Sequence, residues 1–378
     1  MRKTIILLIT VILVTTSGLT AVSVKGDTTA RAAVIMDVKT GRILYSKNMN
    51  EKLPMASTTK IMTTLVTVES GKLNEIVKVS RKASIVGGSS IYLKEGEKHS
   101  VEDLLYGVML RSGNDAAYAV AEHVGGSVEN FVEMMNRKAT EIGAMNTHFA
   151  NPHGLDAAGH YTTAHDLALI TSYALRNPEF AKIVSTKKKK IEGPPNENWD
   201  RMLVNKNKML WQFEGGDGVK TGYTGKAGRC LVSSATRNGM QLVSVVLNCG
   251  PMWSDSAVLL EYGFKNYSYE KLVDRNEVYK VVEVKNGKEK LVPIKPTEDF
   301  SMPLKQEEKD KVKILTNLSS NVEAPLRKGD QAGKLEVYLD NKLVKAVPLQ
   351  FNDSIESSSP IYYFKKIMLD FVTEKDWN

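Results

Sequence analysis

The order in which strand-like and helix-like segments follow one another constrains the fold of this 378-residue chain more than any other feature. Residues 32–37 and 42–45 read as two strands around a turn at 39–41, which predicts an opening β-hairpin. Strand patterns then return only after Gly216. Helical apolar spacing fills the interval, in residues 57–70, 101–109, 115–124, 128–142 and 164–175. Helices grouped between an opening hairpin and closing antiparallel strands predict an α+β fold.

One segment of this interval follows neither periodicity. Residues 187–200 carry four lysines and then Gly193 and two prolines, which continue neither a helix nor a strand. We expect a solvated surface loop there, although a lysine run can also bind an acidic partner.

The N-terminus has the features of an export signal. Arg2 and Lys3 precede the apolar run 5–14, and the small residues at 21–23 fit a signal-peptidase site. We predict a cleaved signal peptide over residues 1–25; an uncleaved membrane anchor is the alternative, because the apolar stretch is nearly long enough to span a bilayer. An exported chain with a net charge of +8 meets acidic wall polymers and anionic lipid rather than nucleic acid, unless the charge serves solubility alone.

From about residue 269 the sequence becomes β-rich. Residues 278–284 and 291–294 flank a turn at Asn286, and residues 335–339 and 343–349 flank a second turn. These two hairpins predict a small β-sandwich domain over residues 269–352.

The last segment, residues 353–378, is expected to be a polar linker followed by an amphipathic helix. Its large apolar side chains fall on one helical arc: Phe364, Ile367, Met368, Phe371 and Val372. Such an arc predicts association with a membrane surface, with packing on the β domain as the alternative. Three basic and three acidic side chains from Ile361 onward cancel, so attraction to anionic lipid should be weak.

The two cysteines, Cys230 and Cys249, flank the hairpin turn at Asn238. If Arg237 pairs with Met240, the two cysteines are diagonal neighbours about 7–8 Å apart. That separation is too long for an unstrained disulfide. Free thiols packed as small hydrophobic groups are therefore expected.

Three short elements occur in order: Ser57–Lys60, Ser112–Asn114 and Lys220–Gly222. Ser57 lies three residues before Lys60 at the start of an apolar helix, so both side chains share one face and the amine can reach the hydroxyl. Taken alone, Ser57 would be read as a helix N-cap and the other two elements as a loop and a strand end. Their occurrence together, in this order, changes that interpretation.

The ordered triple resembles the SxxK, SxN and KTG motifs of the serine penicillin-binding proteins and β-lactamases. Within that superfamily the chain is similar to the low-molecular-weight D-alanyl-D-alanine carboxypeptidases, from about residue 30 to the C-terminus. Further similar segments are 54–56, 87–89, 151–155, 159–163 and 217–219. The resemblance implies a β-lactamase/transpeptidase-like catalytic domain, an antiparallel sheet with helices, over residues 26–268.

The resemblance also implies a role for each motif residue. Ser57 would attack the bond between two terminal D-alanines of a peptidoglycan stem peptide, and β-lactam antibiotics would acylate the same residue. Lys60 would accept the serine proton, which requires a pKa shift of about 3.4 units, or ~4.6 kcal/mol. The remaining roles are proton relay to the leaving amine by Ser112, contact with the peptide or Lys60 by Asn114, recognition of the carboxylate by Lys220 and Thr221, room for substrate at Gly222, and an oxyanion-binding N–H from Tyr223 beside that of Ser57.

Two departures from the family pattern affect substrate recognition. Tyr223 stands where many members have histidine, and residues 251–255 lack an arginine that members often use to bind the carboxylate. A β-lactamase is one alternative function, but residues 144–176 contain no glutamate for deacylation. A non-catalytic sensor or wall-binding protein, merely acylated by penicillin, is the other.

No cofactor, metal or nucleic acid is expected. His148, His153, His160 and His165 are spaced by five, seven and five residues, which does not place metal ligands together on a helix. Neither a phosphate-binding glycine loop after a strand nor an array of aromatic and basic residues is found.

Overall fold

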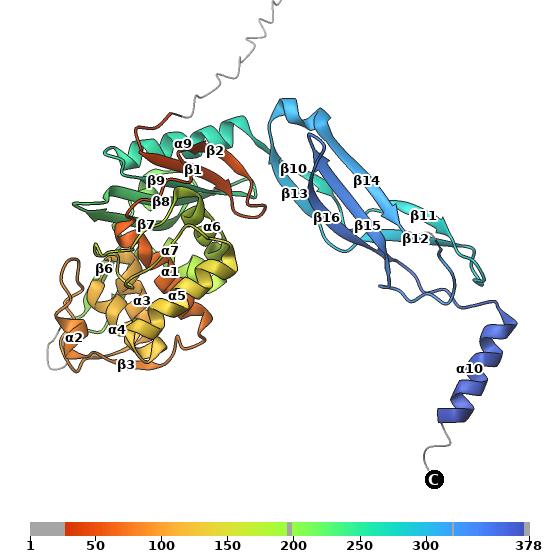
Figure 1. The fold of residues 1–378 in the computed structure, drawn as a ribbon, viewed down its shortest axis with the longest axis horizontal. Helices are drawn as coiled ribbons and strands as arrows, with labels where there is room; N and C mark the ends of the chain where they lie inside the picture. Colours follow the sequence, from red (N-terminus) through yellow and green to blue (C-terminus); the bar gives the residue numbers. More distant parts are fainter. Residues whose placement is uncertain (1–26, 195–198, 320, 374–378) are drawn as a thin grey trace, which may run out of the picture.

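The computed structural model describes residues 27–194, 199–319 and 321–373. The predicted signal peptide, residues 1–25, lies outside these ranges. The chain forms an α+β unit followed by a smaller all-β unit and a terminal helix (Figure 1). The predicted fold class is therefore confirmed for both folded units.

A five-stranded antiparallel sheet forms the centre of the α+β unit, in the order β2-β1-β9-β8-β7. Successive residues of β1 point to opposite faces, and every one of them is buried, because helices cover both sides of the sheet. The strands are β1 (Ala32–Asp37), β2 (Ile43–Lys47), β7 (Gly216–Thr224), β8 (Gly228–Arg237) and β9 (Met240–Leu247).

One face of the sheet is covered by α9 (Met252–Asn266), whose Leu259 and Leu260 pack with Ile35 of β1. The opposite face carries the larger helical layer (Figure 1). That layer comprises η1 (Ala56–Thr59), α1 (Lys60–Glu69), α2 (Arg81–Ser84), α3 (Val101–Leu110), α4 (Asn114–Gly125), α5 (Val128–Ile142), α6 (Ala164–Leu175) and α7 (Pro178–Ser185). The short helix α8 (Met209–Gln212) contributes Met209 to the core on the α9 side.

Two small two-stranded sheets lie outside the main sheet and correct two predictions. β3 (Ile76–Lys78) pairs with β4 (Lys98–Ser100), so strands do occur before Gly216. The lysine run is not a loop: β5 (Lys188–Ile191) pairs with β6 (Arg201–Val204). Within the strand, the ammonium groups of Lys188 and Lys189 lie over aromatic rings, 6.0 Å from Trp211 and 4.8 Å from Tyr106, and these contacts favour a strand that the lysine-rich composition concealed.

The cysteine prediction is confirmed. Arg237 pairs with Met240 across the β8–β9 turn, as expected. Cys230 and Cys249 are free and buried. Burial raises the pKa of each thiol to about 11, so both remain protonated at neutral pH.

The second unit has its own hydrophobic core between two sheets. The larger sheet has the order β11-β12-β16-β15-β14, and β10 pairs with β13 in the smaller one. The elements are β10 (Ser268–Val273), β11 (Lys280–Glu283), β12 (Leu291–Pro296), β13 (Phe300–Leu304), η2 (Gln306–Lys311), β14 (Val312–Leu318), β15 (Gln331–Leu339) and β16 (Lys342–Phe351).

Contacts at the junction hold the two units together. The guanidinium of Arg42, at the edge of the first sheet, donates to the Pro303 carbonyl and pairs with Glu308. Tyr267 lies between two cations, with Arg42 at 5.6 Å and Lys305 at 5.5 Å from its ring centroid. These polar contacts supplement the direct chain connection between α9 and β10.

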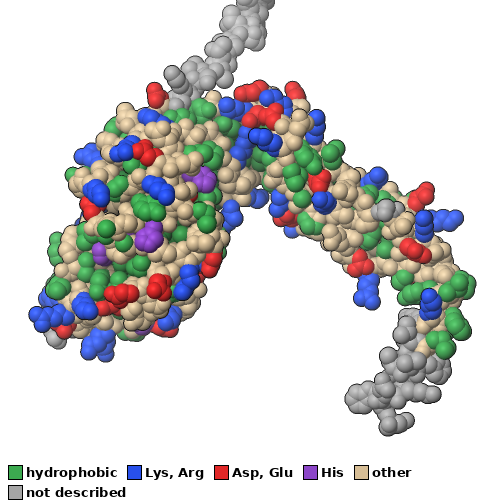
Figure 2. All heavy atoms as spheres, viewed as in Figure 1, with side chains coloured by type: hydrophobic (Ala, Val, Ile, Leu, Met, Phe, Trp, Pro, Cys, Tyr) green, Lys and Arg blue, Asp and Glu red, His purple; other side chains and the backbone are tan. Residues whose placement is uncertain are grey.

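The chain continues into α10 (Pro360–Thr373), which projects away from the all-β unit (Figure 1). Hydrophobic side chains gather around the start of this helix in the space-filling view (Figure 2). Ile361 and Phe364 are about two-thirds exposed. In the described part of the chain no helix is long and apolar enough to cross a membrane.

Candidate active site

The turn that carries Ser57 is a single 3-10 turn, η1, that leads directly into α1. The hydroxyls of Thr58 and Thr59 donate to the carbonyls of Met55 and Ala56, at 2.6 and 2.8 Å, and hold this turn. Ser57 does not serve as an N-cap, because the N-cap residues of η1 and α1 are Met55 and Thr59. The Ser57 hydroxyl is therefore not engaged in helix capping.

His160 contacts the same turn through the Thr59 hydroxyl. The Ala150 N–H donates to Nδ1 of His160, so Nε2 carries the proton and donates to the Thr59 hydroxyl at 2.8 Å. Burial lowers the pKa of His160 to about 4, which keeps the ring neutral in this tautomer. Of the four histidines between residues 148 and 165, His160 is thus a packing residue. Within the described ranges, no group of three or more His, Cys, Asp or Glu side chains could hold a metal ion.

Lys60 is fully buried at the start of α1, and its Nζ has three neighbours. The Ser57 Oγ lies at 3.2 Å and the Asn114 Oδ1 at 2.6 Å, and the His153 carbonyl is the third partner. The Asn114 amide is oriented because its Nδ2 donates to the Gly87 carbonyl at 2.7 Å. Asn114 therefore offers Lys60 an oxygen, and two of the three neighbours can only accept.

These neighbours decide where a neutral amine would place its lone pair. A neutral amine has two N–H donors, and the oxygens of Asn114 and His153 use both. The lone pair then faces the Ser57 hydroxyl, which is the geometry of a general base. Burial, followed by the charges of Lys220 and Lys206, lowers the pKa of Lys60 well below its usual range, while Asp115 opposes the shift.

Two glycines let the backbone close around the nucleophile. A Cβ on Gly154 would lie 2.0 Å from the Ala56 carbonyl oxygen, and a Cβ on Gly222 would lie 3.1 Å from the Ser57 nitrogen. Strand β7 therefore passes directly beside the nucleophile turn. The close passage brings Gly222 beside the Ser57 nitrogen, and Tyr223 is the next residue along the strand.

The opposite wall is formed where α3 ends and α4 begins. Ser112 is buried in a left-handed conformation with φ of +65°, between the two helices. Asp115, in the first turn of α4, accepts from the Ser90 hydroxyl at 2.6 Å and from the Leu93 N–H at 3.0 Å. The Asn114 N–H donates to the Ser89 carbonyl at 2.7 Å. The second motif and the segment 87–93 thus form one ordered wall.

On β7, Lys220 is buried and its Nζ donates to the Thr221 carbonyl at 2.9 Å. Burial, together with the nearby charge of Lys206, lowers the pKa of Lys220 to about 7. Its ammonium can therefore lose its proton within the physiological range.

A cleft of about 320 Å³ opens between these walls. It brings together Ser57, Ser112, Thr221, Gly222 and Tyr223 of the predicted set, while Lys60, Asn114 and Lys220 lie buried next to it. Sequence reasoning missed four further lining residues: Ser89, Lys206, Met252 and Trp253. In the sequence, residues 87–89 stand out only through the family resemblance, and residues 251–255 only through the lack of an arginine.

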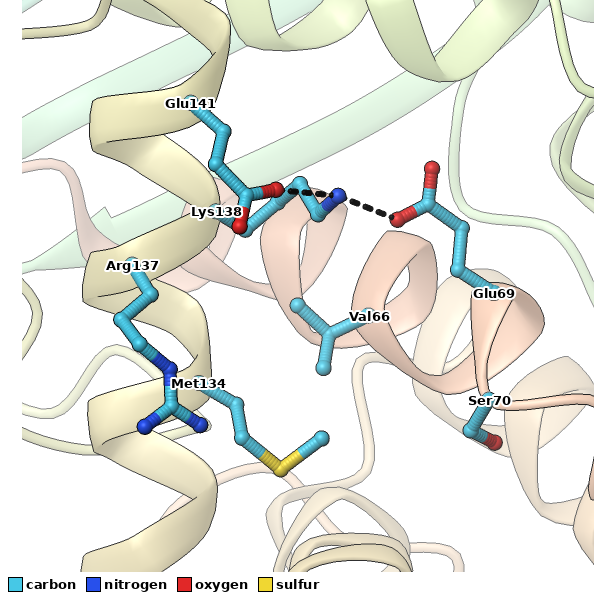
Figure 3. A pocket seen from close by; sticks show the side chains of 7 residues that line it. All are labelled: Val66, Glu69, Ser70, Met134, Arg137, Lys138 and Glu141. Atoms are coloured by element: carbon cyan, nitrogen blue, oxygen red, sulfur yellow. Dashed lines mark ion pairs between the residues drawn. The ribbon is translucent and has the colours of Figure 1, made fainter.

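Another hollow lies between α1 and α5, away from the serine (Figure 3). Lys138 bridges Glu69 at 2.9 Å and Glu141 at 2.7 Å within it. Glu69 ends α1, nine residues after Lys60, which corresponds to about 13 Å along a helix. Its charged groups already neutralise one another, so we assign this hollow no chemistry.

Comparison with protein-family models gives two matches. Residues 19–250 match the family described as D-alanyl-D-alanine carboxypeptidase, peptidase S11. Residues 267–357 match the C-terminal domain of penicillin-binding protein 5.

Individual relatives agree with these matches. The chain is 36% identical over 357 residues to the D-alanyl-D-alanine carboxypeptidase DacF of Bacillus subtilis, covering 92% of this chain and 91% of that protein. It is 34% identical over 366 residues to DacC of Escherichia coli, covering 92% and 88%. Among solved structures, penicillin-binding protein 5 of Haemophilus influenzae is similar with a TM-score of 0.73 and 34% identity, covering 88% of this chain and 98% of that one.

Proposed function

The chain belongs to the D-alanyl-D-alanine carboxypeptidase family of serine peptidases, and on this premise we propose that it removes the terminal D-alanine from peptidoglycan stem pentapeptides through an acyl-enzyme on Ser57. The observation that carries the proposal is the position of Lys60. This buried amine has two obligate acceptors on one side and the Ser57 hydroxyl on the other.

In the acylation step, the Ser57 Oγ attacks the carbonyl carbon between the two D-alanines while its proton passes to neutral Lys60. Negative charge develops on the substrate oxygen. The N–H groups of Ser57 and Tyr223 are our candidates for binding it, supported by the close passage of β7 at Gly222. When the tetrahedral intermediate collapses, the C–N bond breaks and D-alanine leaves.

The leaving amine needs a proton, and Ser112 can relay one from protonated Lys60 because its hydroxyl lines the cleft beside Ser57. Thr221 and Lys220 bind the terminal carboxylate in this scheme. Water then attacks the ester, with Lys60 again accepting a proton, and Ser57 is regenerated. A β-lactam would acylate Ser57 by the same first step and remain attached longer.

A two-substrate assay tests this proposal. The processed protein is incubated with a pentapeptide ending in D-Ala-D-Ala and, separately, with labelled penicillin. We expect release of D-alanine and an adduct that mass spectrometry places on the peptide containing Ser57. The adduct should vanish in Ser57→Ala and persist in Ser89→Ala, which alters another serine of the same cleft.

Other outcomes of this assay identify other functions. Rapid turnover of penicillin without release of D-alanine would indicate a β-lactamase. A stable adduct without any peptide cleavage would indicate a non-catalytic sensor. An adduct that survives Ser57→Ala would contradict the assignment of the nucleophile.

We further propose that the protein works outside the cytoplasmic membrane, where its substrate is found. The N-terminal signal pattern supports export, and the boundaries proposed for the mature units remain 26–268 for the catalytic domain, 269–352 for the β domain and 353–378 for the linker and tail. The exposure of Ile361 and Phe364 on α10 supports contact of the tail with a membrane surface.

A truncation after Ser359 tests the role of the tail. Burying five large apolar side chains contributes about 1.5 kcal/mol or more each, which can hold the helix in an interface without net charge. The signal-processed, truncated chain should leave the membrane fraction and keep full activity on a soluble peptide. If it still sediments with membranes, or unfolds, the interfacial role is wrong.

A further inference from the structure

Arg201, the first residue of β6, is a buried arginine whose guanidinium contacts four acceptors. Its Nε donates to the Ile91 carbonyl and its Nη2 to the Tyr92 carbonyl, both at 2.9 Å. Nη1 donates to the Glu192 carbonyl at 3.2 Å, and Nη2 also donates to the Glu97 carboxylate at 2.9 Å. Only 4% of the Arg201 side chain and 1% of the Glu97 side chain are exposed. A planar guanidinium with donors on three nitrogens suits such a set of acceptors.

Glu97 balances the charge of Arg201. Its carboxylate also accepts from the Lys94 N–H at 2.9 Å and from the His99 Nε2 at 2.8 Å. Burial alone would raise the pKa of Glu97, but the hydrogen bonds from His99 and Arg201 hold that pKa below its usual value. Glu97 is therefore ionised at neutral pH, and a charge-assisted hydrogen bond fixes the guanidinium in place.

The backbone that Arg201 binds is held from its other side by Asp115 of α4. The Ile91 N–H donates to the Asp115 carboxylate at 3.1 Å, whereas the Ile91 carbonyl accepts from Arg201. The next residue, Tyr92, has a left-handed backbone with φ of +61°, and its side chain is 80% exposed. A non-glycine residue keeps such a conformation where surrounding contacts impose it. Two tethers, one on α4 and one on β6, therefore fix this part of the segment 87–93.

The same segment orients the Asn114 amide beside Lys60. The Gly87 carbonyl accepts from the Asn114 Nδ2 at 2.7 Å, while the Asn114 Oδ1 accepts from the Lys60 Nζ at 2.6 Å. A Cβ on Gly88 would lie 2.7 Å from the same Nδ2, so the backbone packs directly on the amide. Movement of the segment would release Nδ2 and let the amide turn over, which would place a donor instead of an acceptor beside Lys60. The lone pair of a neutral Lys60 would then turn away from Ser57.

We propose that Arg201 is a positioning residue for the acylation of Ser57. It fixes the segment 87–93 through two carbonyls, and this segment keeps the Asn114 oxygen directed at Lys60. The inference rests on the proposed function, in which Lys60 is the base. Arg201 is not among the described residues that line the cleft. Its loss should therefore slow the chemical step and leave ligand binding nearly unchanged.

The test measures acylation by labelled penicillin over a range of concentrations, which separates the maximum rate constant from the half-saturating concentration. The variant combines Arg201→Gln with Glu97→Gln, because the double substitution leaves neither partner as an unpaired buried charge. We expect a maximum rate constant roughly ten- to a hundredfold lower and a half-saturating concentration within about twofold of wild type. Backbone N–H groups of residues 87–93 should also exchange faster with solvent.

Two control variants separate positioning from stability. Glu97→Gln alone keeps the contacts of Arg201 with the two carbonyls and should acylate near the wild-type rate. Arg176→Gln removes another arginine that donates to a backbone carbonyl, that of Val38 at 2.8 Å, and should lower Tm without slowing acylation. If the double variant does not fold, Arg201→Lys takes its place. A lysine has its three donors on one nitrogen and cannot span the same acceptors, so acylation should again be slower.

Three results would overturn the inference: an unchanged maximum rate constant in the Arg201 variants, a loss confined to the half-saturating concentration, or equal slowing in either control. Failure of the proposed function would appear separately. In that case the wild-type protein would be acylated by penicillin and yet release no D-alanine from a pentapeptide.

Discussion

Substitution of Gly154 by alanine should separate the geometry of the nucleophile turn from the stability of the fold. Gly154 has a left-handed backbone with φ of +88°. An added Cβ would lie 2.0 Å from the Ala56 carbonyl oxygen and 2.9 Å from the Ser57 nitrogen, both backbone atoms that cannot rotate away. The nucleophile turn must therefore shift, and with it the N–H that we assign to the oxyanion.

Two effects of different size are expected. The left-handed conformation costs an L-residue about 1–2 kcal/mol, which corresponds to a fall in Tm of roughly 2–8 °C for a domain of this size. Displacement of one oxyanion donor costs about 10²–10³ in rate. The loss of acylation in Gly154→Ala should therefore be much larger than its loss of stability would suggest.

Gly159→Ala is the matched control. Gly159 is also left-handed, with φ of +74°, but an added Cβ would meet only the His148 ring, at 3.6 Å, an ordinary contact distance. Gly154→Ala should lower Tm at least as much as Gly159→Ala, because its Cβ also meets backbone atoms. At a temperature well below both Tm values, only Gly154→Ala should acylate slowly with labelled penicillin. Equal acylation rates in the two variants would refute the idea that Gly154 sets the position of the nucleophile.

Three further predictions concern the lysines and the junction. Lys60→Arg should abolish acylation at every pH tested, because arginine does not deprotonate, and normal labelling would contradict the base role of Lys60. In the proposed scheme Lys220, with a pKa of about 7, binds the carboxylate while protonated, so KM for the peptide should rise as the pH passes upward through about 7; a flat KM between pH 6 and 9 would count against this. Arg42→Ala should lower Tm by removing the contacts with Glu308 and Pro303 while kcat/KM on a soluble peptide stays unchanged, and a large loss of activity would show that the β domain shapes the cleft.

Several helix boundaries could be predicted because local hydrogen bonds define them. The hydroxyls of Ser100, Ser127 and Thr163 accept from backbone N–H groups three residues later and start α3, α5 and α6. Left-handed Gly143 ends α5. The apolar periodicity and these capping residues indicate the same helix ends, so the expected ranges of α5 and α6 match the structure.

Other elements depend on partners far away in the chain. Helix α9 was missed, since Pro251 precedes it without a side-chain cap and the helix is set by its packing on the sheet. Strand β5 was missed because its lysines are accommodated by the pairing with β6 and by rings such as that of Tyr106, 4.8 Å from Lys189. Lys206 belongs to no short sequence motif that would mark it as a site residue. It lines the cleft only because of the folded turn in which it lies.

Burial of the two lysines of the cleft, Lys60 and Lys220, lowers the free energy of unfolding while their amines are charged. A pKa of about 7 for Lys220 instead of 10.5 is a difference of roughly 3.5 units, or about 5 kcal/mol against folding whenever the amine is charged. Because the unfolded chain holds that proton up to about pH 10.5, stability should rise with pH between about 7 and 10.5 and be lowest below 7. An anionic substrate that enters the cleft offsets this penalty by pairing with the charge. The desolvation that weakens the folded protein is therefore the same effect that lowers the pKa values of Lys60 and Lys220, which the proposed mechanism requires of Lys60 as a base.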